Sequence, residues 1–295
     1  MRRVMIGLGL LGLAQSAHAA DLDPYLRGSN VPTYHWAGFY GGLQVGYSMG
    51  TYDFSNGVSS LLNFILSGYP SLAGDVSGWN VFGQASTSAV TYGGFVGYNA
   101  EWDNVILGVE FNYDRTSMFK SASNTASGPD PNPFTLSPAE YYTFNSVTVN
   151  GTTSVKITDM ATLRGRAGWE AGGVLPYAFA GIAVGRANVT QSASASATYT
   201  DWVNTCTTTL GVVSCTFQPV LNGLGQPLVR RLSFAPQSTT QSGKFVYGGA
   251  AGLGLDMALM SNVFLRLEWE YLLFQPIDGI HANVNSIRTA LGFLF

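Results

Sequence analysis

The chain has 295 residues, of which 11% are charged and 13% are aromatic, and its formal net charge is −3. A typical soluble domain has a charged share of roughly 25%, so this composition argues against a protein whose whole surface lies in water. The slight negative charge also excludes a basic surface for nucleic acid.

The N-terminus has the three regions of a secretory signal peptide. Two arginines follow the first methionine, an apolar run then extends to Ala14, and small residues lead up to Ala19 and Ala20. A basic start, a short apolar centre and an A-x-A-like end are typical of such a signal. We therefore predict that residues 1–20 are a signal peptide, cleaved after Ala19 or Ala20, and that residues 21–35 form a periplasmic arm.

The rest of the chain alternates in residue type with the period of a β-strand. No later segment is apolar over the roughly 20 residues that a membrane-spanning helix needs, and only helices and closed barrels satisfy every backbone group in lipid. Eight segments of about ten residues alternate as barrel strands do. In chain order they cover approximately residues 36–49, 89–101, 105–114, 155–170, 177–189, 244–258, 263–271 and 286–295.

The two faces of these segments differ in composition. One face carries aliphatic and aromatic residues, and the other carries glycine and isolated charges, as lipid-facing and lumen-facing residues of an outer-membrane barrel do. A soluble lipocalin-like barrel is the alternative, but it needs a polar outer face, which the third, seventh and eighth segments lack. We predict an all-β fold: a single antiparallel, eight-stranded transmembrane up-and-down β-barrel over residues 36–295.

The connections between the segments alternate between tight turns and long stretches rich in Ser, Thr, Asn, Gly and Pro. This pattern predicts short periplasmic turns and long extracellular loops, which we expect to be solvated and mobile. Cys206 and Cys215 lie in one such stretch, and an exported chain meets an oxidising compartment, so we expect a loop disulfide. No histidine lies nearby, so we expect no metal site there, and the sequence indicates no cofactor.

Eight charged residues share the inward-facing parity. They are Glu110, Arg164, Arg166, Asp256, Arg266, Glu268, Glu270 and Arg288. The interior of an eight-stranded barrel is just wide enough for side chains to fill, and unpaired buried charges are costly. We therefore expect an ion-paired plug in which Arg164 or Arg166 pairs with Glu110. A gate or narrow ion path is the alternative interpretation of the same charges.

The spacing of Glu268 and Glu270 is loosely compatible with paired-carboxylate catalysis. The neighbouring arginines would hold both carboxylates ionised, so we expect no enzymatic activity.

Several motifs in order resemble a known family. They are Trp36–Gly42, Gly108–Glu110, Thr162–Gly168 with Pro176 and Tyr177, Arg266–Tyr271, and the terminal Phe295. Together they resemble the small eight-stranded outer-membrane barrels related to opacity proteins and the OmpA transmembrane domain of Gram-negative bacteria. The resemblance covers most of the chain outside the long loops, which are larger than the family leads us to expect. It implies a location in the cell outer membrane, both termini in the periplasm, and a surface-antigen or structural role rather than catalysis.

The last strand carries a second pattern. Its alternating residues Ile287, Leu291, Phe293 and Phe295 resemble the terminal signal that the barrel-assembly machinery reads. We expect this machinery, outer-membrane lipid and lipopolysaccharide to be partners.

Three functions fit the sequence. The first is a non-enzymatic surface barrel with a structural, envelope-integrity role and loop-mediated adhesion. The second is a porin or small channel, although porins use roughly 16 strands to enclose an aqueous lumen. The third is a protein whose loops bind a small ligand such as haem or a host receptor. The loop aromatics that permit the third function are Phe54, Phe64, Tyr141, Tyr142 and Trp202.

Overall fold

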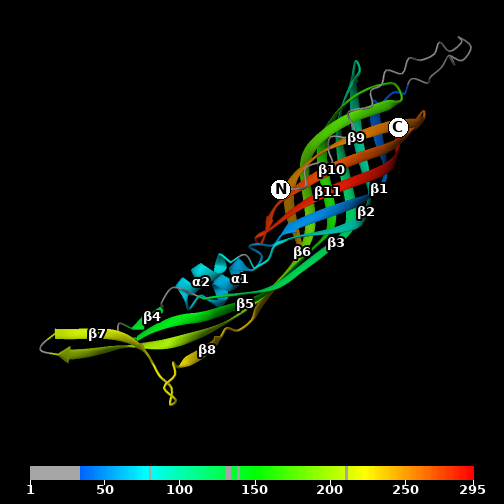
Figure 1. Ribbon diagram of the computed structural model, residues 1–295. Helices are drawn as coiled ribbons and strands as arrows, with labels where there is room; N and C mark the ends of the chain where they lie inside the picture. Colours follow the sequence, from blue (N-terminus) through cyan, green and yellow to red (C-terminus); the bar gives the residue numbers. More distant parts are fainter. Residues whose placement is uncertain (1–33, 80, 130–133, 138–139, 210–211) are drawn as a thin grey trace, which may run out of the picture. The chain divides into compact units, whose positions relative to one another are not determined.

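A computed structural model of the chain describes residues 34–79, 81–129, 134–137, 140–209 and 212–295. The predicted signal peptide, its cleavage site and nearly all of the predicted arm lie outside these residues. The described part of the chain forms eleven strands and two short helices (Figure 1). No described helix is both long enough and apolar enough to cross a membrane.

Eight of the described strands close into an antiparallel ring in which each strand pairs with its two neighbours and β11 pairs back to β1. In order round the ring, the strands are β1 (Gly38–Asp53), β2 (Gln84–Trp102), β3 (Val105–Gly128), β5 (Glu140–Trp169), β6 (Val174–Thr209), β9 (Gln237–Met260), β10 (Val263–Ile277) and β11 (Ile280–Leu294). Each contains or overlaps one of the eight predicted segments. The predicted eight-stranded up-and-down barrel is therefore confirmed.

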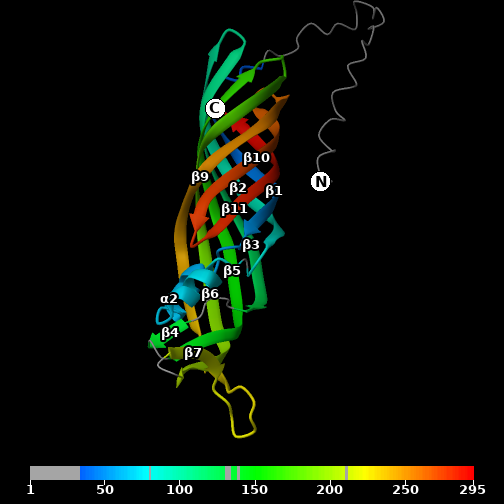
Figure 2. The ribbon, with the colours of Figure 1, turned by 60° about the vertical axis from the view of Figure 1, so that its left-hand side comes forward.

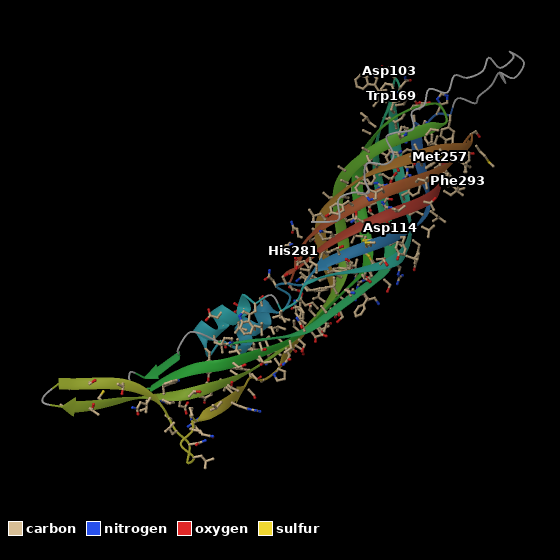
Figure 3. The ribbon with its side chains drawn as sticks, in the orientation of Figure 1. Asp103, Asp114, Trp169, Met257, His281 and Phe293 are labelled. Carbon is tan, nitrogen blue, oxygen red and sulfur yellow. The ribbon has the colours of Figure 1, made fainter. Side chains whose placement is uncertain are left out.

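Tight turns join the strands at one end of the barrel, which we call the turn end. Asp103 lies in the β2–β3 turn with a φ of 55°. Figure 3 shows Asp103, Trp169 and Phe293 towards this end, and His281 towards the opposite one, which we call the loop end. At the loop end, β10 and β11 meet at Asp278 and Gly279, whose φ angles of 49° and 81° are typical of a two-residue hairpin turn.

Four of the barrel strands continue far beyond the loop end. β3, β5, β6 and β9 stay paired there, for example Ser123 with Thr152, Thr152 with Ser192 and Ser192 with Ser238. We call this part the outer sheet; Figures 1 and 2 show it leaving the barrel as long ribbons. Three short strands extend it: β4 (Phe134–Ser137) pairs with β5, and β7 (Val212–Pro219) and β8 (Val229–Ser233) pair with β6.

The first long connection folds into two helices beside the outer sheet. In α1 (Ser59–Ile65), Leu62 is buried together with the flanking Val58 and Leu66, which share one helix face at a spacing of four residues. In α2 (Pro70–Ser77), Leu72, Ala73 and Val76 are buried. These residues face the inner side of the outer sheet and form one apolar core with it.

The outer sheet is regular because its strands keep a period of two in a sequence of small residues. On β6, Ala193, Ala195 and Ala197 are buried, whereas the serines between them face away. The expectation that the long connections are solvated and mobile is therefore wrong for most of their length. Alanine alternating with serine has too little hydrophobicity to stand out in the sequence, and only the packing of the helices buries it.

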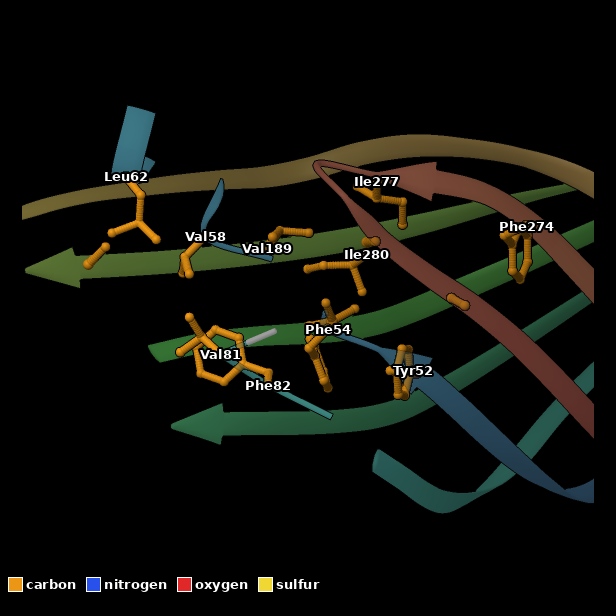
Figure 4. Close-up of a cluster of buried hydrophobic side chains, with 14 of the residues drawn as sticks. Tyr52, Phe54, Val58, Leu62, Val81, Phe82, Val189, Phe274, Ile277 and Ile280 are labelled. Atoms are coloured by element: carbon orange, nitrogen blue, oxygen red, sulfur yellow. The ribbon is translucent and has the colours of Figure 1, made fainter. Parts of the chain in front are cut away.

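The apolar core continues from the outer sheet into the mouth of the barrel. Figure 4 shows Phe54 and Tyr52 beside Ile277, Ile280 and Phe274, which come from the ends of β10 and β11. Both aromatic side chains are fully buried. The loop end of the barrel is thus closed by apolar side chains rather than open to water.

Candidate functional site

The inward-facing residues of β10 show how the barrel interior is layered. From the turn end they are Phe264, Arg266, Glu268, Glu270, Leu272 and Phe274, all buried. An apolar layer, a charged layer and a second apolar layer therefore follow one another along a single strand. The other seven barrel strands add their inward residues to the same three layers.

Glu110 on β3 lies at the centre of the charged layer. Its Oε1 lies 2.5 Å from Nη2 of Arg164, and its Oε2 lies 2.8 Å from Nη1 of Arg266 and 3.3 Å from Nη1 of Arg166. All four side chains are buried. Both arginines that we expected near Glu110 contact it, and a third guanidinium joins them.

The remaining charges extend the network to both sides. Asp256 accepts hydrogen bonds from Nε of Arg266 at 2.8 Å and from Nη2 of Arg166 at 2.7 Å. Glu268 bridges two guanidiniums, with its oxygens 2.5 Å from Nη2 of Arg164 and 2.5 Å from Nη2 of Arg288. Glu270 lies farther from the same two arginines, at 3.3 Å and 3.0 Å. All eight predicted lumen residues are therefore buried in one connected network.

Sequence reasoning missed several members of this network. Asp114 forms an ion pair with Arg288, and it shares the parity of Glu110, which is the signal that could have found it. The hydroxyl of Tyr40 donates to Glu110 at 2.7 Å, and that of Tyr177 donates to Glu268 at 2.8 Å. Each tyrosine donates to a carboxylate oxygen that also accepts a hydrogen bond from an arginine, so the hydroxyls add to the ion pairs.

Aromatic rings also line the charged layer. The guanidinium of Arg164 lies 3.8 Å from the ring centre of Phe179, and that of Arg166 lies 3.7 Å from the ring centre of Tyr177. Such stacking stabilises a desolvated cation through the ring's quadrupole. A planar guanidinium can stack and form hydrogen bonds in its plane at once, which an ammonium cannot do. The arginines therefore fill space as well as carry charge.

A small apolar cluster closes the turn end of the interior. Trp36 packs against Tyr34 and Phe264, with ring centres 4.4 Å and 5.9 Å apart, and Ile106 and Leu175 complete the layer. Burial, with a smaller contribution from Asp256, raises the pKa of the Tyr34 hydroxyl to about 12. This hydroxyl therefore stays neutral and adds no charge to the layer.

The interior of the barrel is therefore filled in three layers, two apolar and one ion-paired. The interior of an eight-stranded barrel is just wide enough for side chains to fill. Among the described residues, no group of three or more His, Cys, Asp or Glu side chains is arranged to hold a metal ion.

The predicted loop residues lie in different environments. Cys206 is disulfide-bonded, and the register of β6 and β7 places Cys215 directly opposite it. Phe54 is buried in the apolar core, so it is not available to a ligand, and this part of the loop-aromatic hypothesis is wrong. Phe64 is exposed and Trp202 is half-buried. The side chains of Tyr141 and Tyr142 lie outside the described set.

The C-terminal pattern lies on the outer face of β11. Ile287, Leu291, Phe293 and Phe295 are all exposed, and Phe295 is 87% exposed. The backbone N–H of Phe295 donates to the carbonyl of Phe39 at 2.8 Å, so the last residue also closes the ring. Recognition of these residues by the assembly machinery stays a prediction.

An antiparallel eight-stranded barrel with an apolar, aromatic outer face and a filled polar interior is the architecture of a bacterial outer-membrane protein. The family model of the outer membrane protein beta-barrel domain matches residues 6–295, so the chain belongs to this family. The protein is located in the outer membrane of a Gram-negative bacterium. Its turn end faces the periplasm, and its loop end and outer sheet lie outside the cell.

Solved structures of other small barrels are similar at low identity. Ail, the attachment invasion locus protein of Yersinia pestis, is 12% identical over 87% of this chain and 99% of that one, with a TM-score of 0.33. Neisserial surface protein A is 13% identical over 88% and 98%, with a TM-score of 0.34. The N-terminal β-barrel domain of Pseudomonas aeruginosa OprF is 10% identical over 85% and 97%, with a TM-score of 0.28. No curated protein matches the sequence.

Proposed function

We propose that this protein is a non-enzymatic surface barrel that supports the integrity of the outer envelope and adheres to other surfaces through its outer sheet. The observation that carries the proposal is the filled interior combined with an outer sheet that packs against two helices beyond the loop end. Because its lumen is filled, the barrel serves as a membrane anchor. The outer sheet and the two helices packed on it lie outside the membrane, where they can contact partners.

The far end of the outer sheet supports an adhesive role. Apolar side chains are exposed on β7 and on the segment between β7 and β8, including Val213, Leu221 and Leu224, the last of which is 85% exposed. Exposed apolar side chains at the end of a domain are candidates for contact with another protein. The disulfide at Cys206 braces the strand next to them, which lowers the entropy lost on binding.

A channel function is disfavoured by the same geometry. The charged layer is bounded on both sides by buried aromatic and aliphatic side chains. Steady conductance would need both apolar layers and the ion pairs to rearrange together. Single-channel recording of the folded protein in a planar bilayer tests this point, and we expect no steady steps. Large, steady steps would overturn the non-conducting part of the proposal.

Adhesion is tested with bacteria that display the protein and bind to surfaces coated with extracellular-matrix protein. We expect Val213→Ser/Leu224→Ser to lower the number of bound cells. Phe64→Ser is the matched control, because it removes an exposed apolar side chain from α1, away from the far end. Equal binding by the wild type, the double variant and the Phe64→Ser control would overturn the adhesive role. The envelope role is tested separately, by measuring the sensitivity of a deletion strain to detergent.

A further inference from the structure

The hydrogen-bonded ring of the barrel ends on both sides of the outer sheet. The pairing of β2 with β3 stops at Tyr92 and Arg115, and the pairing of β9 with β10 stops at Gly248 and Phe274. Beyond these residues, the described parts of β3, β5, β6 and β9 pair only with one another and with the short strands that extend them. Ring closure therefore constrains the barrel but not the outer sheet.

Each of the three strand pairs in this wall has a register shift where the ring ends. The shifts lie at Arg115–Met118 on β3, Ile157–Asp159 on β5 and Ala187–Val189 on β6. Ile157 pairs with Met118 on one side and with Ala187 on the other, so the three shifts adjoin one another across the sheet. A β-bulge interrupts the ladder and bends its strand, and bulges are frequent at the rims of barrels. We call this row of shifts the bulge line.

The shift between β6 and β9 shows how the ladder is interrupted. Three steps on β9, from Gln241 to Lys244, lie opposite two steps on β6. Gly243 lies within them with a φ of 68°, in the left-handed region that glycine adopts readily. Its N–H donates to the side-chain Oδ1 of Asn188 at 2.6 Å. A side chain therefore takes the place of a ladder partner at this point.

The turn of the β10–β11 hairpin bridges the bulge line. Oδ1 of Asp278 lies 2.7 Å from Nζ of Lys244, which is on the barrel side of the β6–β9 shift. The backbone carbonyl oxygen of Asp278 accepts a hydrogen bond at 3.1 Å from Nε2 of Gln191, which is on the outer side of that shift. One turn residue thus holds a side chain from each side of the line.

A second ion pair outside the lumen provides a comparison. Arg230 on β8 pairs with Asp201 on β6, with Nε and Oδ2 2.8 Å apart. Both residues belong to the outer sheet, beyond the bulge line. Their ion pair therefore joins parts of one region, whereas the contacts of Asp278 join two.

We propose that the bulge line is a hinge between the barrel and the outer sheet, and that the hairpin turn at Asp278 is the latch that holds this hinge in one position. With the latch open, the interrupted ladders let the outer sheet tilt as a unit on the barrel. Ile277 and Ile280 stay in the apolar core, so the motion is a small tilt. The hinge goes beyond the adhesive role, because it is independent of what the far end binds.

The exposure of the latch makes it sensitive to salt. The side chains of Lys244 and Asp278 are 37% and 24% exposed. Salt screens such a pair, because the Debye length falls from about 10 Å at 0.1 M to about 3 Å at 1 M ionic strength. The ion pairs of the lumen are buried and are screened much less. Ionic strength outside the cell is therefore the condition to which this latch responds.

Distances between two spin labels test the hinge in the folded, full-length protein in detergent micelles. Labels on Ser196→Cys/Asn285→Cys report the position of the outer sheet relative to the barrel, because the two exposed sites lie on β6 beyond the bulge line and on β11. Labels on Ser261→Cys/Asn285→Cys both lie in the barrel and serve as the control pair. Cys206 is disulfide-bonded and takes no label.

Asp278→Asn should broaden the distance distribution between positions 196 and 285. Asparagine tolerates the left-handed φ of this position and retains the backbone carbonyl, so the variant removes the charge alone. We expect the population with a displaced outer sheet to rise about threefold, as the loss of one partly exposed ion pair predicts. Arg230→Gln is the matched control and should leave the distribution unchanged. Equal broadening by both variants, or by neither, would overturn the latch.

High salt should act on the wild type in the same way. We expect it to broaden the distribution between positions 196 and 285 about as much as Asp278→Asn does, and to leave the control pair within the barrel unchanged. The Asp278→Asn variant should not respond further to salt, because its latch has no ion pair to screen. An equal salt response in the wild type and the variant would contradict this role of the ion pair.

Deletion of Gly243 tests the hinge itself. The deletion gives β9 as many steps as β6 between their flanking pairs, so the ladder between them becomes continuous. In the Asp278→Asn background, we expect the deletion to narrow the distribution to its wild-type width. A distribution that stays as broad as in Asp278→Asn alone would show that the motion does not arise at the bulge line. The change in gel mobility on heating verifies that each variant is folded.

Discussion

The inside of one continuous wall is filled in two different ways: by charged residues in the barrel lumen, and by the apolar core between the outer sheet and the two helices, which we call the outer core. In the lumen, Glu110, Arg164 and their partners occupy the space with ion pairs. In the outer core, Leu62, Phe54 and the alanines of β6 occupy it with apolar contacts. The wall strands β3, β5, β6 and β9 run through both regions.

The two regions differ in how they tolerate a substitution. A buried ion pair is stable only if both partners remain, because the loss of one leaves an uncompensated charge in a medium of low dielectric constant. An apolar core loses only the burial and contacts of the atoms removed. We therefore expect neutralisation of one central charge to affect the whole barrel, and truncation in the outer core to act locally.

Glu110→Gln should have the largest effect. The neutral side chain would leave three guanidiniums close together without the carboxylate that they share. We expect the free energy of unfolding to fall by about 3–5 kcal/mol, measured by urea titration of the folded protein in lipid vesicles. A loss below about 1 kcal/mol would mean that water screens the charged layer.

Leu62→Ala should have the next largest effect, and its effect should be local. The side chain is 1% exposed in the outer core, and such a truncation costs about 2–5 kcal/mol. We expect faster hydrogen exchange in α1 and the facing parts of β6 and β9, with no change in the barrel below Leu272. Faster exchange throughout the barrel would show that the two regions unfold together.

Gly279→Ala tests the contact between the hairpin and the first loop. A Cβ at Gly279 would lie 2.6 Å from the carbonyl oxygen of Asn56, and the φ angle is +81°, so we expect a loss of about 2 kcal/mol. Gly172→Ala is the matched control: its φ is +67° but the space around it is open, so it should cost only about 1 kcal/mol. If urea titration gave the two variants equal losses of unfolding free energy, the contact with Asn56 would not be the cause of the loss in Gly279→Ala.

Glu270→Gln should have the smallest effect and sharpen the comparison with Glu110. The described charged layer holds five carboxylates and four guanidiniums, so removal of one negative charge balances it. Glu270 also makes the longer contacts, at 3.0 Å and 3.3 Å, and an amide oxygen can still accept hydrogen bonds. We expect a change below about 1 kcal/mol in the same titration. A loss of unfolding free energy as large as that of Glu110→Gln would contradict the interpretation that the charged layer has one surplus negative charge.

The alternation of residue types determined the eight barrel strands and the inward charges. In lipid a strand needs one apolar face along its whole length, so Val109 and Phe111 show the outer face and Glu110 the inner one. The same rule could not decide partners. Arg266 contacts Glu110, and Arg164 contacts Glu268, across the lumen between strands that are not neighbours, and these contacts depend on how the ring closes.

Only the tertiary structure decided that the long connections fold into the outer sheet and its core. An alternation of alanine and serine, such as Ala195 and Ser196, does not distinguish a paired strand from a solvated loop in the sequence. The reason is that alanine contributes little hydrophobic free energy by itself. Leu62 and Val76 come from a distant segment, and their packing is what gives the alanine face something to be buried against. A sequence pattern shows which residues share a face. The free energy gained by burying that face depends on which residues from the rest of the chain pack against it.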